Sequence, residues 1–147
     1  MELLKKQEHK RIVIMGCGRL GAYLADQLYS EGQEVIIIDN HDDSFRKLSS
    51  SFGGLTLMSD GTELETFDQI EISKDDVMIV VTDNDNTNIM ISQIAREIYK
   101  VENIICRLYD PERECVYDEF KIDTICPTYL SVHRIEEILE DKGVHVL

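Results

Sequence analysis

The chain has 147 residues, 43% of them hydrophobic and 30% charged, and its 29 Asp and Glu against 15 Lys and Arg give a formal net charge of −14. This length suits one domain with a sizeable core, and eight Gly with only two Pro exclude a linker or low-complexity chain. We expect a cytoplasmic globular domain that binds no nucleic acid, because the sequence is acidic and shows neither a signal segment nor a membrane-length apolar run.

A short basic arm comes first along the chain. Residues 1–10 include Lys5, Lys6 and Lys10 and precede the first apolar run. Two interpretations stay open, a solvated terminus or a contact with an acidic surface. We expect the domain itself to cover residues 11–142 and a short tail to occupy 143–147.

Short apolar, β-branched runs alternate with helical segments through the rest of the sequence. The runs lie at 11–15, 34–38, 54–58, 77–81, 103–107 and 122–126, so their starts are 19 to 26 residues apart. That spacing accommodates a strand, a crossover helix and two turns. The runs are continuous rather than alternating, which is typical of a sheet covered on both faces. They predict an α/β fold: a Rossmann-like, doubly wound, mostly parallel six-stranded sheet with helices on both faces.

Helical periodicity marks three segments between and after these strands. Their apolar positions are Leu20, Leu24 and Leu28; then Met90, Ile91, Ile94, Ala95 and Ile98; and finally Val132, Ile135, Ile138 and Leu139. We expect the first helix to end near Gly32 and the last, at 128–142, to end at Gly143. For the last helix two arrangements stay open: it packs only on its own sheet, or Tyr129 and Val132 pack on a second copy of the chain.

The cysteines and histidines show no metal-binding spacing. Cys17, Cys106, Cys115 and Cys126 form no Cys-x-x-Cys pair, and the four His are scattered. We expect reduced, buried thiols and no metal site. A disulfide between Cys106 and Cys126, on neighbouring strands, is the alternative.

A glycine-rich turn is the strongest signal in the sequence. It directly follows the first strand and opens the first helix, and it consists of Gly16, Cys17, Gly18, Arg19, Leu20 and Gly21. In such a turn the first glycine permits the tight bend, the second leaves room for a phosphate, and the third allows close packing of helix and strand. The helix N-terminus offers amides and a partial positive charge to a phosphate, and Arg19 adds a cation there.

Asp39 at the end of the second strand completes this pattern, 18 residues beyond Gly21. A carboxylate at this position accepts hydrogen bonds from ribose hydroxyls. A 2′-phosphate would face that carboxylate, and Asn40 supplies no compensating cation. We therefore predict a site for NAD(H) or an adenine nucleotide, with NADP disfavoured. The alternative is a tight turn without a ligand, in which Asp39 only caps the segment that follows.

Polar residues also follow the third, fourth and fifth strands, whose carboxyl ends meet at the same edge of the sheet. They are Asp60, Gly61 and Thr62, then Thr82 and Asp83, and finally Arg107. Helix capping is the alternative for Asp60 and Asp85, and residues 41–43 either cap the second helix or contact the ligand. A charged residue that ends a buried strand needs a partner, which for Arg107 is Asp83, a phosphate or another subunit.

At these residues the chain resembles the potassium-transport nucleotide-binding domain family, known as TrkA-N, KTN or RCK N-lobe. The shared pattern comprises the glycine-rich turn, the acid after the second strand, Asp60-Gly61-Thr62, the run Thr-Asp-Asn-Asp-Asn-Thr-Asn at 82–88, and Arg107. The resemblance implies a cytosolic, non-enzymatic regulatory subunit that gates a membrane potassium transporter or channel. It also implies binding of NAD(H) or adenine nucleotides, assembly into dimers and rings, and a position at the inner face of the membrane through the transporter.

Carried over by position, the family pattern assigns roles to individual residues. Gly16, Gly18 and Arg19 would hold phosphates and Asp39 the ribose. Asp60 and Thr62 would flank the adenine. The distal part of the nucleotide, or a neighbouring subunit, would meet Thr82, Asp83 and Arg107. The family usually continues into a smaller C-terminal lobe, which we expect to be missing here because only four residues follow Gly143.

Two other functions stay open. A small NAD-dependent oxidoreductase is disfavoured, because we expect no His or Lys near a strand end as an acid or base. The other is a nucleotide sensor that serves a partner outside transport, which a shared fold does not exclude.

Overall fold

The computed structural model describes residues 10–113, 118 and 121–145. The predictions for Lys5, Lys6 and Cys115 therefore lie outside the described residues. All strand pairings are parallel, and the order β3-β2-β1-β4-β5-β6 reverses direction between β1 and β4. The strands are β1 (Ile12–Met15), β2 (Val35–Asp39), β3 (Leu55–Met58), β4 (Val77–Val80), β5 (Asn103–Arg107) and β6 (Asp123–Ile125). The predicted Rossmann-like sheet is confirmed.

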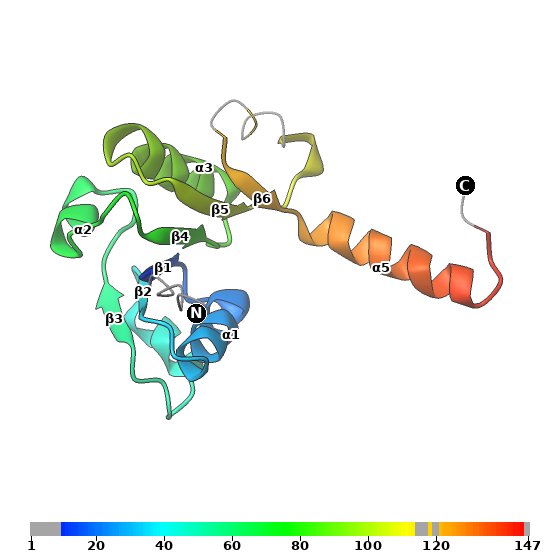
Figure 1. Ribbon diagram of the computed structural model, residues 1–147, viewed down its shortest axis with the longest axis horizontal. Helices are drawn as coiled ribbons and strands as arrows, with labels where there is room; N and C mark the ends of the chain where they lie inside the picture. Colours follow the sequence, from blue (N-terminus) through cyan, green and yellow to red (C-terminus); the bar gives the residue numbers. More distant parts are fainter. Residues whose placement is uncertain (1–9, 114–117, 119–120, 146–147) are drawn as a thin grey trace, which may run out of the picture.

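Helical segments connect the strands and cover both faces of the sheet (Figure 1). They are α1 (Arg19–Ser30), the 3₁₀ segment η1 (Asp42–Lys47), α2 (Leu64–Gln69), α3 (Asp85–Gln93) with its π-helical continuation η2 (Ile94–Ile98), the short η3 (Pro111–Arg113) and α5 (Pro127–Asp141). The sequence did not reveal that the segment after β2 is a 3₁₀ helix. It lacks the apolar repeat of an α-helix and contains no buried residue.

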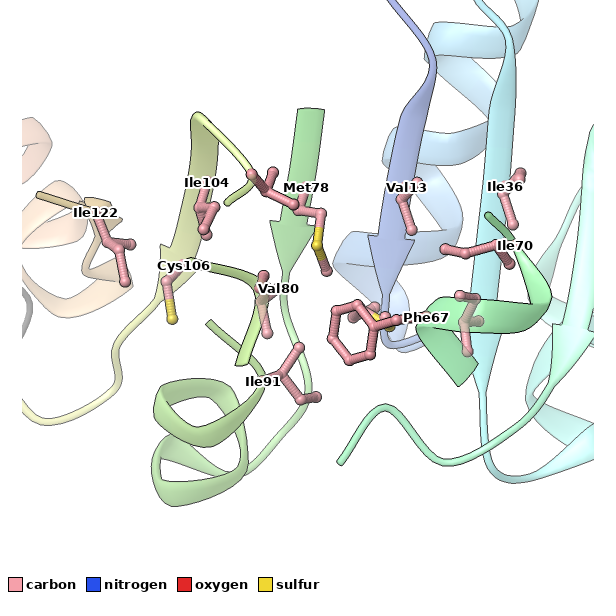
Figure 2. Packing of buried hydrophobic residues seen from close by; sticks show 14 of the residues in the cluster. Val13, Ile36, Phe67, Ile70, Met78, Val80, Ile91, Ile104, Cys106 and Ile122 are labelled. Carbon is pink, nitrogen blue, oxygen red and sulfur yellow. The ribbon is translucent and has the colours of Figure 1, made fainter. Parts of the chain in front are cut away.

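Two apolar clusters lie on opposite faces of the sheet, because successive strand residues point to opposite sides. Val13 and Met15 belong to one cluster, which α2 and α3 cover; Ile12 and Ile14 belong to the other, which α1 covers. Figure 2 shows the first cluster, where Phe67 of α2 lies over the central strands. The continuous apolar runs are thus buried on both sides in β1, β2 and β4, whereas the edge strands β3 and β6 are partly exposed.

Three of the cysteines, Cys17, Cys106 and Cys126, are buried, and none of them forms a disulfide. The alternative of a bond between Cys106 and Cys126 is therefore wrong. Burial, together with the nearby Asp39 carboxylate, raises the pKa of Cys17 to about 11.

Turns that lead into three strands contain a non-glycine residue in the left-handed region. These residues are Glu71, Lys100 and Lys121, with φ of 48°, 56° and 54°. Gly32 occupies the corresponding place after α1, with φ of 89°. An L-residue pays a steric cost there that glycine avoids.

The last helix, α5, extends away from the rest of the fold (Figure 1). None of its residues is buried, and its exposed large apolar side chains are Tyr129, Leu130, Val132, Ile135 and Ile138. Of the two arrangements left open for this helix, packing only on its own sheet is therefore wrong. Its predicted end is confirmed, because Gly143 has φ of 81° and its amide donates to the Glu140 carbonyl oxygen at 2.9 Å.

Candidate functional site

A cavity of about 350 Å³ lies at the carboxyl ends of the strands, where the strand order reverses. The predicted site residues that line it are Gly16, Cys17, Gly18, Asp39, Asn40, Asp60, Gly61, Thr82, Asp83 and Arg107. Arg19, Leu20, Gly21 and Thr62 are not among its lining residues. The fold thus gathers residues from five strand ends around one space.

The glycines of the turn occupy three different steric environments. A Cβ at Gly16, where φ is 112°, would lie 2.9 Å from the backbone of Val81 and Thr82. A Cβ at Gly21 would overlap the carbonyl oxygen of Gly16. At Gly18 a Cβ would meet no atom within 4 Å, although the residue lines the cavity. Packing therefore requires glycine at positions 16 and 21, whereas the glycine at position 18 leaves space open in the cavity.

The N-terminus of α1 borders this space. Gly18 is its N-cap, no side chain caps the helix, and the first turn contains no acidic residue. A helix end of this kind attracts an anion through its amides and dipole. Arg19 is exposed and lies outside the cavity lining, so the cation that the sequence placed there does not face the cavity in this structure.

Backbone amides hold the Asp39 carboxylate at the edge of the cavity. Its Oδ2 accepts from the Cys17 amide at 2.9 Å and its Oδ1 from the His41 amide at 2.8 Å. The side chain is only 15% exposed. The Gly16 amide donates to the Ile38 carbonyl oxygen at 2.8 Å. The amides of Gly16 and Cys17 are therefore both hydrogen-bonded within the protein, and the first amide of the turn that could bind a phosphate is that of Gly18.

The 3₁₀ segment η1 and its N-cap bring His41 and Lys47 to the cavity. Ligand contact by residues 41–43 was one of the two interpretations, whereas Lys47 was not among the predicted site residues. Both lie on the η1 side of the cavity, near the end of β2, where no His or Lys was expected as an acid or base. His41 is the N-cap of η1, and its Nδ1 lies 3.7 Å from Asp39 Oδ1. The Cys17 thiol donates to the Ser44 carbonyl oxygen at 3.3 Å and seats η1 against the glycine turn. The sequence signal for His41 was its place two residues after the β2 acid; Lys47 gave no such signal.

Asp60 lines the cavity from the end of β3, and Thr62 orients it. Asp60 Oδ1 accepts from the Thr62 amide at 2.9 Å and from its hydroxyl at 2.7 Å. These bonds, the hydroxyl one foremost, lower the pKa of Asp60. Helix capping by Asp60 is wrong, because Glu63 is the N-cap of α2.

Arg107 contacts backbone carbonyls rather than an acid. Its Nη2 donates to Val81 at 2.7 Å and to Thr82 at 3.0 Å, and its guanidinium lies 4.7 Å from the centroid of the Tyr109 ring. Asp83 is not its partner, so that alternative is wrong. Within the described part of the chain its buried Nε has no hydrogen-bond partner. An unsatisfied buried donor at a cavity wall is the kind of group that a ligand oxygen satisfies.

Three polar side chains near the start of α3, those of Asn84, Asp85 and Asn88, lie outside the cavity lining and bond backbone groups near the ends of β4 and β5. Asn84 caps the helix by accepting from the Thr87 amide at 3.0 Å. Asp85, for which capping was one interpretation, instead accepts from the amides of Tyr109 at 2.8 Å and of Asp110 at 3.0 Å. Asn88 is fully buried and was not among the predicted site residues.

Within 10–113, 118 and 121–145, no three His, Cys, Asp or Glu side chains form a group that could hold a metal ion. In the same part of the chain no helix is long and apolar enough to cross a bilayer.

Comparison with known proteins gives consistent matches. The model of the TrkA-N domain family matches residues 12–127. The Trk system potassium uptake protein TrkA of Streptomyces coelicolor is 42% identical over 136 residues, and a TrkA homolog of Methanothermobacter thermautotrophicus is 31% identical over 129. These matches cover 92% and 87% of this chain but only 61% and 59% of the relatives.

Solved structures share the fold. The GsuK channel bound to NAD superposes with a TM-score of 0.77 at 23% identity, covering 92% of this chain and 24% of that one. The AMP-bound Kef C-terminal domain of Shewanella denitrificans gives a TM-score of 0.73 at 19% identity, covering 91% of this chain and 82% of that one. At these identities the likeness concerns the fold alone.

Proposed function

We propose that this chain, which belongs to the TrkA-N domain family, is a nucleotide-binding regulatory subunit. It gates a membrane potassium uptake system in response to NAD(H) or an adenine nucleotide and performs no catalysis itself. The observation that carries the proposal is the Asp39 carboxylate, held by the Cys17 amide beside the open Gly18 position. Its curated relatives are named for potassium uptake.

The residues around the cavity fit a nucleotide. Gly18 and the uncapped start of α1 would hold a phosphate, because nothing fills the space a Cβ would take. Asp39 would accept from the ribose hydroxyls. Asp60 would border the adenine. Of the cations that line the cavity, Lys47 lies on the η1 side and Arg107 on the β5 side. Together they offset part of the local negative charge, although the chain as a whole is acidic.

The regulatory subunit in this proposal is a homo-oligomer joined through α5. This helix has no buried residue, and its apolar side chains Tyr129, Val132 and Ile135 are exposed. Exposed apolar stripes of this kind mark protein contacts. We expect sedimentation to show a dimer or a ring of dimers and Ile135→Glu to give monomers. A wild-type monomer at high concentration would contradict this part of the proposal.

We propose further that the nucleotide-binding domain covers residues 11–142 and is cytoplasmic. It would reach the inner face of the membrane through its transporter partner. The oxidoreductase alternative is disfavoured by the positions of His41 and Lys47, which line the η1 side of the cavity beside Asp39. In Rossmann-like folds the second strand end holds the adenosine ribose rather than the reactive part of the cofactor.

Thermal denaturation with NAD, NADH, NADP, ATP, ADP and AMP tests the ligand. A nucleotide at a hundred times its Kd adds about 2.7 kcal/mol to the free energy of unfolding, or about 5–11 °C in Tm for a chain of this size. Asp39→Ala should abolish the shift, whereas Asp26→Ala, a control that removes a carboxylate outside the cavity lining which accepts from the Ser49 amide, should retain it. If no adenine-containing ligand raises the Tm, the assignment of the site is overturned.

A chimera tests the regulatory role. Residues 12–127 replace the matching segment of the Streptomyces coelicolor relative, and rubidium uptake is measured in cells that lack that relative. We expect uptake with the chimera and its loss with Asp39→Ala. Nucleotide binding by the chimera without any uptake would instead favour a sensor for another partner, and oxidation of NADH by a test panel of carbonyl compounds would favour the enzyme.

A further inference from the structure

We infer that Asn88 is a positioning residue that shapes the distal half of the cavity and thereby suits the site to a dinucleotide. This inference rests on the proposed function, because it concerns the same nucleotide site. Asn88 does not line the cavity. Its side chain lies wholly inside the protein, on α3, behind the ends of β4 and β5.

The Asn88 amide makes every hydrogen bond it can. Its Oδ1 accepts from the Thr82 amide at 3.0 Å and from the Thr82 hydroxyl at 2.5 Å. Its Nδ2 donates to the carbonyl oxygens of Thr82 and Arg107, each at 3.1 Å. An asparagine side chain offers two donors and two acceptor sites, all used here. One residue thus fixes the backbone where two neighbouring strands end.

The Arg107 guanidinium depends on the same backbone. Its Nη2 donates to the Thr82 carbonyl oxygen, which also accepts from Asn88 Nδ2. Asn88 therefore holds both the backbone that carries Arg107 and the carbonyl against which its guanidinium rests. The hydroxyl of Thr82 is held as well. The Arg107 Nε, which no described group satisfies, keeps its place at the cavity wall through this arrangement.

The lining residues come from both sides of β1 and its glycine turn. Asp39 and Asp60 come from the ends of β2 and β3 on one side, and Thr82, Asp83 and Arg107 come from the ends of β4 and β5 on the other. We call these two sides the first and second halves of the cavity. The adenosine and phosphate of AMP need only the first half and the turn. The second half of NAD must extend toward β4 and β5. Disturbing Asn88 should therefore weaken NAD and spare AMP.

Isothermal titration of Asn88→Asp with NAD and with AMP tests the inference. The aspartate keeps its bonds from Thr82 but turns a carboxylate oxygen, without a hydrogen, toward the two carbonyl oxygens. We expect the Kd for NAD to rise at least about tenfold and the Kd for AMP to change by less than about threefold, since loss of buried hydrogen bonds costs this much. Asp76→Asn is the control: Asp76 is buried at the opposite end of β4, where it pairs with Arg11 at 2.6 Å, and the ratio of the two Kd values should stay unchanged.

Asn88→Ser is the second variant, in case the aspartate prevents folding, because the smaller side chain leaves room for water at the four groups. It should show the same selective loss of NAD. Equal weakening of NAD and AMP in either folded variant, or no change in either, overturns the positioning role. If wild-type protein binds neither ligand, the proposed function itself fails and the inference with it.

Discussion

Gly18→Ala separates nucleotide binding from folding. Gly18 has φ of −82° and ψ of −164°, an extended conformation that alanine adopts without strain, and its Cβ would meet no atom within 4 Å. Removing glycine restricts the unfolded chain and adds about 0.4–1 kcal/mol of stability. Alanine is a poorer N-cap than glycine, which costs a similar amount. We therefore expect the free energy of unfolding to change by less than about 1 kcal/mol, or about 2–4 °C in Tm.

Nucleotide binding should respond in a different way. The added methyl group occupies the space through which a phosphate approaches the turn, so we expect affinity to fall about a hundredfold. At a nucleotide concentration that gives wild type about 2.7 kcal/mol of added stability, the variant would then gain only about 0.4 kcal/mol. Thermal denaturation with and without ligand measures both quantities on one sample.

Gly21→Ala is the matched comparison within the same turn. Its Cβ overlaps the Gly16 carbonyl oxygen and lies 3.4 Å from Val81 Cγ2, so the backbone must move. Such overpacking costs about 1–3 kcal/mol or more even without ligand. If Gly18→Ala binds nucleotide as tightly as wild type, or if Gly21→Ala leaves the Tm unchanged, the steric reasoning is refuted.

Three further predictions concern stability. Lys100→Gly should raise the free energy of unfolding in urea by about 1 kcal/mol, because it relieves a φ of 56°; a loss would refute the strain. Asp85→Ala should speed amide exchange at Tyr109 and Asp110, whose N–H groups it holds, while unchanged protection would contradict this role. Because burial raises the pKa of Cys17 to about 11, the native thiol keeps its proton longer than the unfolded one, so stability should fall as pH rises from 9 to 11. Cys17→Ala should lack that component, and an identical pH dependence would disprove it.

The sequence predicted the sheet well because burial on both faces leaves a local trace. β-branched residues recur without polar interruption in β1, β2 and β4, and the structure places those strands within a residue or so of the predicted bounds. The glycine turn was equally predictable from the sequence. Gly16 and Gly21 are required because a Cβ at either position would collide with backbone atoms, and a strand-turn-helix unit of this kind makes such close backbone contacts. Local pattern and tertiary contact agree at these positions.

The distal side of the cavity was less predictable because its contacts join residues far apart in the sequence. Asn88 bonds Arg107, 19 residues on, and Asp85 bonds Tyr109, 24 residues on. For Asp85 the sequence suggested helix capping, the common role of a polar residue near a helix start, and Asn88 was named only as part of the shared run at 82–88. Lys47 was missed for another reason: a 3₁₀ segment without an apolar face gives no periodic signal that shows which side chains turn inward.

The last helix shows the limit of reading burial from periodicity. The spacing of Val132, Ile135 and Leu139 predicts that one face is removed from water, but it carries no information on what removes it. The same apolar stripe would be needed whether the helix packed against its own chain or against a second copy of the chain. Here the described residues outside α5 leave this helix uncovered. Because an isolated helix of 15 residues is marginal in water, its stability must come from packing. That requirement favours the proposed oligomer, whose contact through α5 would adjoin β6, one strand away from the β5 end that carries Arg107.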